Sequence, residues 1–406
     1  MTEGKINMDN NFNKRKRQKK IVVAMDSFKG SLTSLEAGNA VRDGILEQYP
    51  DVDVQIFPVA DGGEGTVEAL TFGKEHVQTR TISVTGPVGT EVQAWYTIYG
   101  QAGERTAVLE MAQAAGLPLV PEEKRNPMHT TTYGVGEMIR DAIACGCRKF
   151  ILGIGGSATN DAGIGMLQAL GFHFMDEAGK EVGYGAEGLA QVRSITTEDV
   201  MPELASCTFQ IACDVTNPLV GAQGCSAVFG PQKGATPSMI MEMDQWLENY
   251  AALAGGKFPK ADPKKAGTGA AGGLGFAFLT FTDAVLESGI KIVLEETRLE
   301  EYIREADLVI TGEGQMDGQT AMGKAPIGVA GLAKKYGKTV IAFTGAAGVD
   351  AEKCNEHGID AFFPILRNVV TLEEAMKNEN AKRNLADTAE QVYRLWRAGT
   401  GSVSVF

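Results

Sequence analysis

The chain has 406 residues, of which 44% are apolar and 22% are charged, a composition typical of a globular protein with about two or three domains. Its net charge of −13 disfavours nucleic acid and anionic membranes as partners, although local charge can still attract an anionic small molecule. The sequence has no apolar run of about 18 residues and no signal-peptide core, so we expect a soluble, cytoplasmic protein whose oligomeric state cannot be read from it.

The start of the chain is basic. The first 20 residues hold seven lysines and arginines against two acidic residues. Such a stretch can serve as a nuclear-localisation or nucleic-acid patch, but we predict a disordered tail over residues 1–19. Six scattered cysteines form no CxxC pair and four histidines show no metal spacing, so free thiols are expected.

Two βα units follow the tail. The apolar run Ile21–Ala24 predicts a strand, and Thr33 with Glu36 has the capping-box spacing of a helix start. Residues 52–59 predict a second strand, after which Asp61-Gly62-Gly63-Glu64 is expected to open a second helix. Successive βα units favour a parallel sheet with right-handed crossovers.

The rhythm changes after about residue 75. Residues 76–85 and 91–99 alternate like antiparallel strands, and further segments predict a mixed α/β region. We expect strands at 106–111, 150–154 and 209–213, a helix at 161–170, and a helix at about 276–287 after the Gly/Ala-rich residues 266–275.

The βα rhythm returns near the end, with strands predicted at 307–310, 339–343 and 361–366 and a long C-terminal helix. The fold class we predict is α/β: a discontinuous, flavodoxin-like, doubly wound parallel-sheet domain with an inserted second mixed α/β domain. The expected boundaries are 20–75 plus 288–406 for the first domain and 76–287 for the insert.

Unusual polar clusters follow most of the predicted strands. In an open parallel sheet, ligands bind outside the carboxyl ends of the strands, so we expect these clusters to form one site between the domains. The clusters are Asp26–Lys29, Asp61–Thr66, Gly155–Asp161, Asp214–Asn217, Thr311–Gly314 and Thr344-Gly345.

The stretch Thr311–Pro326, TGEGQMDGQTAMGKAP, indicates phosphoryl chemistry. Glycines let backbone N–H groups approach an anion, and a helix start adds positive potential. Residues 318–324 even have P-loop spacing, but Ala325 stands where Ser or Thr should bind magnesium. An ordinary P-loop is therefore not expected.

Each cluster also has a structural interpretation. Asp61 and Glu64 have the spacing of a helix cap, Thr159 or Asn160 can cap the next helix, and Lys29 can be a solvated surface charge. We favour function for Asp214, because a carboxylate beside a core strand needs a partner, and for Lys324, because of its glycine-rich surroundings.

Long stretches of the chain resemble the bacterial glycerate kinases of type 1, which phosphorylate D-glycerate with ATP. The matching stretches include AMDSFKGSL (24–32), PVADGGEGTVEAL (58–70), GIGGSATNDAGIGMLQALG (153–171), CDVTNPLVGAQG (213–224), VFGPQKGA (228–235) and TGEGQMDGQTAMGKAPIGVA (311–330). The resemblance implies an ATP- and Mg²⁺-dependent kinase whose product is 2-phosphoglycerate or, in some members, the 3-phosphate. One departure is Gln315, where the family usually has Arg.

On this resemblance we assign expected roles. ATP would contact the glycine loops, the glycerate carboxylate would meet Ser27 and Lys29, and Lys324 would stabilise the transferred phosphoryl group. Asp214 or Asp61 would act as general base, while Asp161 or Asp317 would hold Mg²⁺. The expected ATP-binding residues are Gly155, Gly156, Ser157, Thr159, Asn160 and Glu313. The alternatives left open are a kinase for another small hydroxy acid, such as tartronate or threonate, and a non-catalytic metabolite-binding regulator.

Overall fold

The computed structural model describes residues 18–63 and 65–400. They form two compact units. The first contains the described residues up to Phe57, Glu300–Met322, and the described residues from Val329 onward. The second contains Pro58–Leu299 and Gly323–Gly328.

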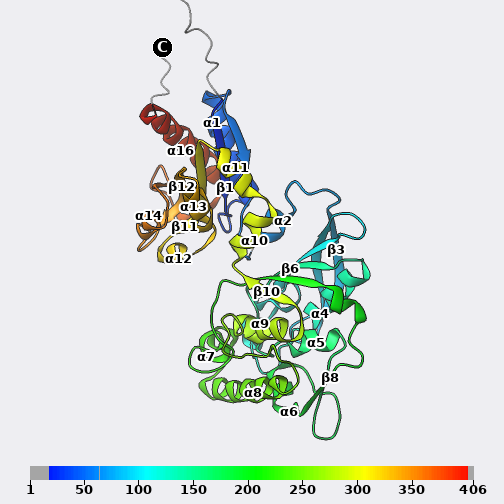
Figure 1. Ribbon diagram of the computed structural model, residues 1–406. Coiled ribbons are helices and arrows are strands. Elements are labelled where there is room, and N and C mark those ends of the chain that lie inside the picture. The colour runs from blue at the N-terminus through cyan, green and yellow to red at the C-terminus, as the bar shows by residue number, and fades with distance from the viewer. Residues whose placement is uncertain (1–17, 64, 401–406) are drawn as a thin grey trace, which may run out of the picture. The chain divides into compact units, whose positions relative to one another are not determined.

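The first unit is built on a five-stranded parallel sheet (Figure 1). Its order is β13-β12-β11-β1-β2, which is the flavodoxin-like order when the strands are counted along the chain. The predicted fold class is therefore confirmed. The strands are β1 (Lys20–Met25), β2 (Asp53–Ile56), β11 (Leu308–Met316), β12 (Thr339–Ala347) and β13 (Ala361–Pro364).

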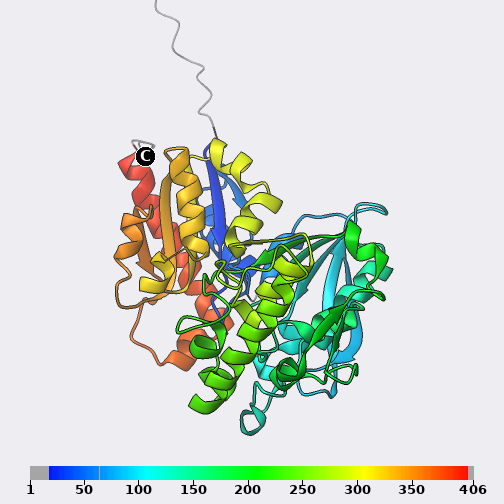
Figure 2. The same ribbon diagram turned by 60° about the horizontal axis from the view of Figure 1, so that its bottom comes forward.

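Helices cover both faces of this sheet. One face packs against α1 (Ser34–Gln48) and α16 (Asn378–Gly399), and α13 (Ala325–Lys335) lies against the other (Figure 2). The predicted capping box is present, because Thr33 Oγ1 accepts from the Glu36 N–H and the Glu36 carboxylate accepts from the Thr33 N–H. The short helices of this unit are α11 (Leu299–Glu305), α12 (Gly318–Ala321), α14 (Lys353–Glu356) and α15 (Leu372–Met376).

The β11 and β12 strands are longer than predicted. The expected loops at Thr311–Gly314 and Thr344-Gly345 lie within them. The parallel register continues through Glu313 opposite Thr344 and ends at Met316 opposite Ala347. The glycines do not break the ladder, because their extended backbone still pairs with the neighbouring strand.

The second unit contains a six-stranded mixed sheet in the order β10-β9-β6-β5-β4-β3, with antiparallel pairs among β3, β4 and β5 and parallel pairs from β5 to β10. The strands are β3 (Gln78–Thr85), β4 (Glu91–Tyr99), β5 (Thr106–Glu110), β6 (Lys149–Gly153), β9 (Thr208–Ala212) and β10 (Ala284–Glu287), beside a separate pair of β7 (His173–Met175) and β8 (Ser194–Thr196). The helices are α2 (Thr66–Thr71), α3 (Ala112–Ala115), α4 (Tyr133–Ala144), α5 (Ile164–Ala169), α6 (Gly185–Gln191), α7 (Cys225–Phe229), α8 (Pro237–Gly255), α9 (Ala270–Phe281) and α10 (Gly289–Glu296).

Three local predictions in this unit were wrong. The helix expected at 276–287 ends at Phe281, because residues 284–287 pair with β9 as an added strand. Residues 161–163 precede α5, which begins at Ile164. The helix α2 begins at Thr66 with Gly65 as its N-cap, so Asp61 does not cap it.

The division by contacts differs from the predicted domain boundaries. The helix α2 packs against β4 and β5, and α10 packs against α2 and β9, so both helices group with the second unit. Where independently folding domains begin and end remains a prediction.

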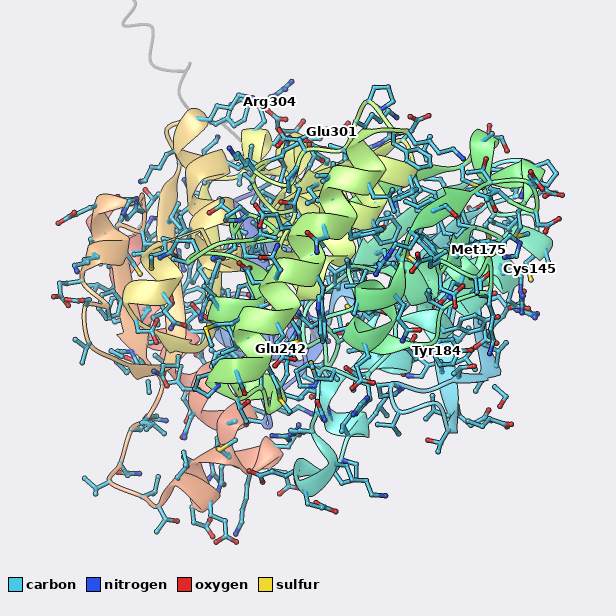
Figure 3. The ribbon with its side chains drawn as sticks, turned by 90° about the horizontal axis from the view of Figure 1, so that it is seen from below. Cys145, Met175, Tyr184, Glu242, Glu301 and Arg304 are labelled. Atoms are coloured by element: carbon cyan, nitrogen blue, oxygen red, sulfur yellow. The ribbon has the colours of Figure 1, made fainter. Side chains whose placement is uncertain are left out.

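The disordered tail was predicted over residues 1–19, of which residues 1–17 lie outside the described residues. Lys19 is described, and its Nζ donates to Asp307 Oδ1 at 3.4 Å. All six cysteines are free, including Cys145 at the end of α4 (Figure 3). No helix in the described part of the chain is long and apolar enough to cross a membrane.

Candidate functional site

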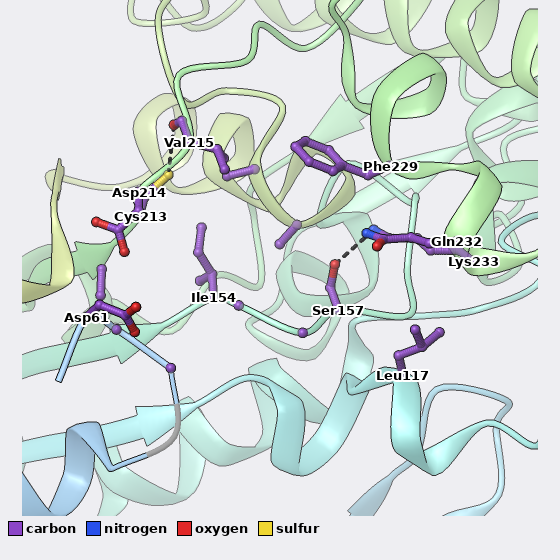
Figure 4. Close-up of a pocket in the computed structure, with 17 residues that line it drawn as sticks. Asp61, Leu117, Ile154, Ser157, Cys213, Asp214, Val215, Phe229, Gln232 and Lys233 are labelled. Carbon is purple, nitrogen blue, oxygen red and sulfur yellow. Dashed lines mark hydrogen bonds between the residues drawn. The ribbon is translucent and has the colours of Figure 1, made fainter. Parts of the chain in front are cut away.

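A pocket of about 330 Å³ lies at the carboxyl ends of β6 and β9 in the second unit (Figure 4). The loop after β6 carries Gly155, Gly156 and Ser157, and the loop after β9 carries Asp214. This is where an α/β sheet places its ligands. The remaining lining residues are Asp61, Gly62, Gly63, Leu117, Ile154, Ala212, Cys213, Val215, Phe229, Gln232, Lys233, Ala270 and Ala271.

One end of the pocket is acidic, with Asp61 and Asp214 close to each other (Figure 4). The Gly289 N–H donates to Asp214 Oδ1 at 3.2 Å. Burial raises the pKa of Asp214 to about 6, and the charge of Asp61 adds to the increase. A carboxylate with this pKa is ionised at neutral pH and is still basic enough to take a proton.

Gly289 also holds the loop that carries Asp61. A Cβ atom on Gly289 would lie 2.1 Å from the Asp61 carbonyl carbon, so the two backbones touch. The start of α10 therefore positions both carboxylates, one by backbone packing and the other by a hydrogen bond.

The opposite end of the pocket is the glycine loop, Gly155-Gly156-Ser157. Two backbone hydrogen bonds anchor this loop to residues 115–117 of the same chain. Leu117 N–H donates to Gly156 O at 2.8 Å, and Ala158 N–H donates to Ala115 O at 2.9 Å. Gly156 has φ +72°, a left-handed conformation that favours glycine. The structure thus brings together three of the residues predicted to contact ATP.

Sequence reasoning missed Lys233. Its stretch, VFGPQKGA, contributed to the resemblance but received no role. The residue is 2% exposed, and its Nζ donates to Ser157 Oγ at 2.8 Å (Figure 4). Nζ also donates to Thr159 O at 2.7 Å. Burial lowers its pKa to about 8. The only available signal was a lysine set between glycine-containing turns.

Asp161, a predicted magnesium ligand, is fully buried. Its Oδ2 accepts from the N–H and Oγ1 of Thr132, both at 2.8 Å, and its Oδ1 accepts from Gly163 N–H at 3.1 Å. Burial raises its pKa, while these bonds favour the ionised form. Because both carboxylate oxygens of Asp161 accept hydrogen bonds from buried protein groups, the arrangement favours a structural role.

Thr159 and Asn160 follow the glycine loop in the chain and are fully buried. Asn160 Nδ2 donates to Ser226 Oγ at 2.9 Å. In the described part of the chain, Thr159 Oγ1 and Asn160 Oδ1 have no hydrogen-bond partner. Neither residue caps α5, whose N-cap is Gly163.

In the first unit, the predicted site residues Ser27 and Lys29 follow β1, and Glu313 lies in the neighbouring strand β11. Ser27 is buried, whereas Lys29 is exposed. A Cβ atom on Gly314 would meet the Phe28 Cα at 3.2 Å, so the loop after β1 packs directly on β11 next to Glu313.

Asp317 and its surroundings form a helix start. Asp317 is the N-cap of α12 and accepts from the Gln319 and Thr320 N–H groups, while Thr320 Oγ1 donates to Glu313 at 2.6 Å. Gln315 donates to Asp317 Oδ2 at 3.1 Å. A helical turn, Gly318–Ala321, therefore occupies part of the P-loop-like spacing. Lys324 is half-buried and groups with the second unit.

Comparison with known proteins identifies the family. Residues 21–397 match the model of the glycerate kinase family. The chain is 47% identical to "Glycerate 2-kinase" of Escherichia coli K12, over 91% of this chain and 97% of that protein, and 46% identical to "Glycerate kinase" of Haemophilus influenzae, over 93% and 98%. A crystal structure of putative glycerate kinase 2 from Salmonella typhimurium LT2 is similar with a TM-score of 0.86 at 45% identity, covering 95% of this chain and all of that one. The chain belongs to the glycerate kinase family and is an ATP-dependent kinase.

Proposed function

We propose that this protein transfers the γ-phosphoryl group of ATP to the 2-hydroxyl of D-glycerate, producing 2-phosphoglycerate. The names of its relatives, glycerate kinase and glycerate 2-kinase, support this substrate. The observation that carries the proposal is the pocket itself, with a carboxylate of raised pKa at one end and a glycine loop at the other.

Asp214 is the proposed general base. Its carboxylate takes the proton of the 2-hydroxyl as that oxygen bonds to the γ-phosphorus, and the bond from phosphorus to the ADP oxygen breaks. Burial keeps the pKa of Asp214 high, and in the ligand-free site the charge of Asp61 adds to the increase. The N–H groups of Gly155 and Gly156 donate to phosphate oxygens.

Mg²⁺ is expected to accompany ATP, and its fit can be judged from the carboxylates. Asp161 is used inside the protein and Asp317 caps α12, so the predicted ligands do not suit the ion. Asp61 suits it better, since Mg²⁺ is usually held by one or two carboxylates together with phosphate oxygens, and a cation there would relieve repulsion with Asp214. When bound, the ion would neutralise phosphate charge.

Other roles remain predictions. They are the binding of the glycerate carboxylate by Ser27 and Lys29, the contact of Glu313, Thr159 and Asn160 with ATP, and charge stabilisation by Lys324. The cytoplasmic location and the expected position of the site relative to the domains are also predictions.

A coupled ADP-release assay tests the proposal. D-glycerate should give the highest kcat/KM in a panel with L-glycerate, tartronate and threonate. No ADP release at millimolar D-glycerate would contradict it, and a preference for another acid would favour the alternative hydroxy-acid kinase. Asp214→Asn should lower kcat by at least about 100-fold, the contribution of a general base.

A further inference from the structure

Lys233 is a buried cation without a direct ion pair in the described part of the chain, and the buried Asp161 carboxylate acts on it only at longer range. Burying an ammonium group is costly unless it is paired, yet no ion pair to Lys233 occurs among residues 18–63 and 65–400. The two atoms that accept hydrogen bonds from its ammonium group, Ser157 Oγ and Thr159 O, are neutral. A buried charge left in this state beside a ligand pocket points to an anion supplied by the ligand.

The glycine loop presents unused donors to the same place. The backbone N–H groups of Gly155, Gly156 and Ser157 donate to no residue that the structure describes, and both glycines are exposed. Successive N–H groups around a left-handed residue form a concavity that binds anions. A Cβ atom on Gly155 would meet nothing within 4 Å, so the approach is open.

The charges of the pocket are divided between its ends. Of the lining residues that the structure describes, Lys233 is the only cationic one, and it lies behind Ser157 (Figure 4). Asp61 and Asp214 are at the other end of the pocket. Within the pocket, an anion is therefore favoured at the end that holds Lys233 and Ser157.

We infer that Ser157 and the glycine loop form a phosphate subsite for the nucleotide, and that Lys233 is a positioning residue that orients the Ser157 hydroxyl and supplies the charge behind it. A phosphate group suits this cradle because its several oxygens can accept from three N–H groups and a hydroxyl together. The inference rests on the proposed function and adds a residue that the proposed function does not use.

The test is calorimetric binding of a non-hydrolysable ATP analogue, AMP-PNP, and separately of D-glycerate, to the full chain. Lys233→Met keeps side-chain length and removes the charge, Ser157→Ala removes the hydroxyl, and a double variant combines them. The control is Lys257→Met, because Lys257 also donates to a backbone carbonyl, Ile195 O at 2.9 Å, but does not line the pocket.

Lys233→Met should weaken AMP-PNP by at least about tenfold, as expected for losing a hydrogen-bond system that involves a charge, and should change D-glycerate affinity less than about twofold. The loss in the double variant should be smaller than the sum of the two single losses, because the lysine acts partly through Ser157. In steady state the KM for ATP should rise more than that for D-glycerate. The control should bind both ligands normally.

Unchanged AMP-PNP affinity in folded Lys233→Met would overturn the inference, and so would a loss confined to D-glycerate, which would mean that the subsite takes a carboxylate. Thermal unfolding checks the fold of each variant. If Lys233→Met does not fold, Ser157→Ala decides: it should weaken AMP-PNP about fivefold or more, and wild-type affinity overturns the inference. If the wild-type protein binds AMP-PNP but does not turn over D-glycerate, the proposed function fails while the subsite is still measured.

Discussion

Asp214→Asn should make the protein more stable at neutral pH while removing most of its activity. The structure raises the pKa of Asp214 from its ordinary 3.8 to about 6, so the folded state disfavours the ionised carboxylate. At about 1.36 kcal/mol per pKa unit this would cost about 3 kcal/mol for a fully buried group. Asp214 is exposed, however, so screening by solvent reduces the cost, and we expect about 1 kcal/mol.

The sign depends on pH. The folded protein holds the Asp214 proton more tightly than the unfolded chain, so the destabilisation is absent below about pH 4, grows between pH 4 and 6, and is complete above pH 6. Asparagine removes the charge and can still accept from Gly289 N–H. Asp214→Asn should therefore melt about 2 to 4 °C above wild type at pH 7.5 and at the same temperature at pH 4, by scanning calorimetry of the ligand-free protein. A lower melting temperature at pH 7.5, or an equal gain at both pH values, would refute the reasoning.

Three further predictions concern residues that support the pocket and the proposed general base. Gly289→Ala places a Cβ atom 2.1 Å from the Asp61 backbone, so kcat/KM should fall by about tenfold or more, whereas Gly255→Ala, which meets nothing within 4 Å, should change it little. Thr132→Val removes the hydroxyl that donates to the buried Asp161 carboxylate and accepts from Met166 N–H, and it should lower the unfolding free energy by about 1 to 3 kcal/mol in urea titrations; no loss would mean that these two bonds do not matter. The wild-type kcat/KM should fall as pH drops below about 6, and a flat profile to pH 5 would argue against a base with the pKa of Asp214.

The fold was predictable where local patterns and pairing agree. The βα rhythm at both ends of the chain predicted the five-stranded sheet, and the Thr33 capping box is present as expected. Errors occurred where tertiary pairing overrides local preference. Residues 284–287 continue a helical pattern in the sequence but pair with β9, and the glycine-rich Thr311–Gly314 extends β11 because β12 pairs with it throughout.

The sequence predicted the part of the site that depends on strand topology, but not the part that depends on side-chain packing. Asp214 and Gly155–Ser157 follow predicted strands, so their convergence could be expected from the topology of a parallel sheet. The burial of Asp161 and the hydrogen bond from Lys233 to Ser157 depend on side-chain packing between distant segments, which periodicity and spacing do not encode.

The most direct test of the central claim is NMR of the product formed from ATP and D-glycerate. We expect a phosphate ester at carbon 2, seen as coupling between phosphorus and the single proton of that carbon, with ADP released in equal amount. A phosphate ester at carbon 3, or no D-glycerate-dependent ester at all, would contradict it.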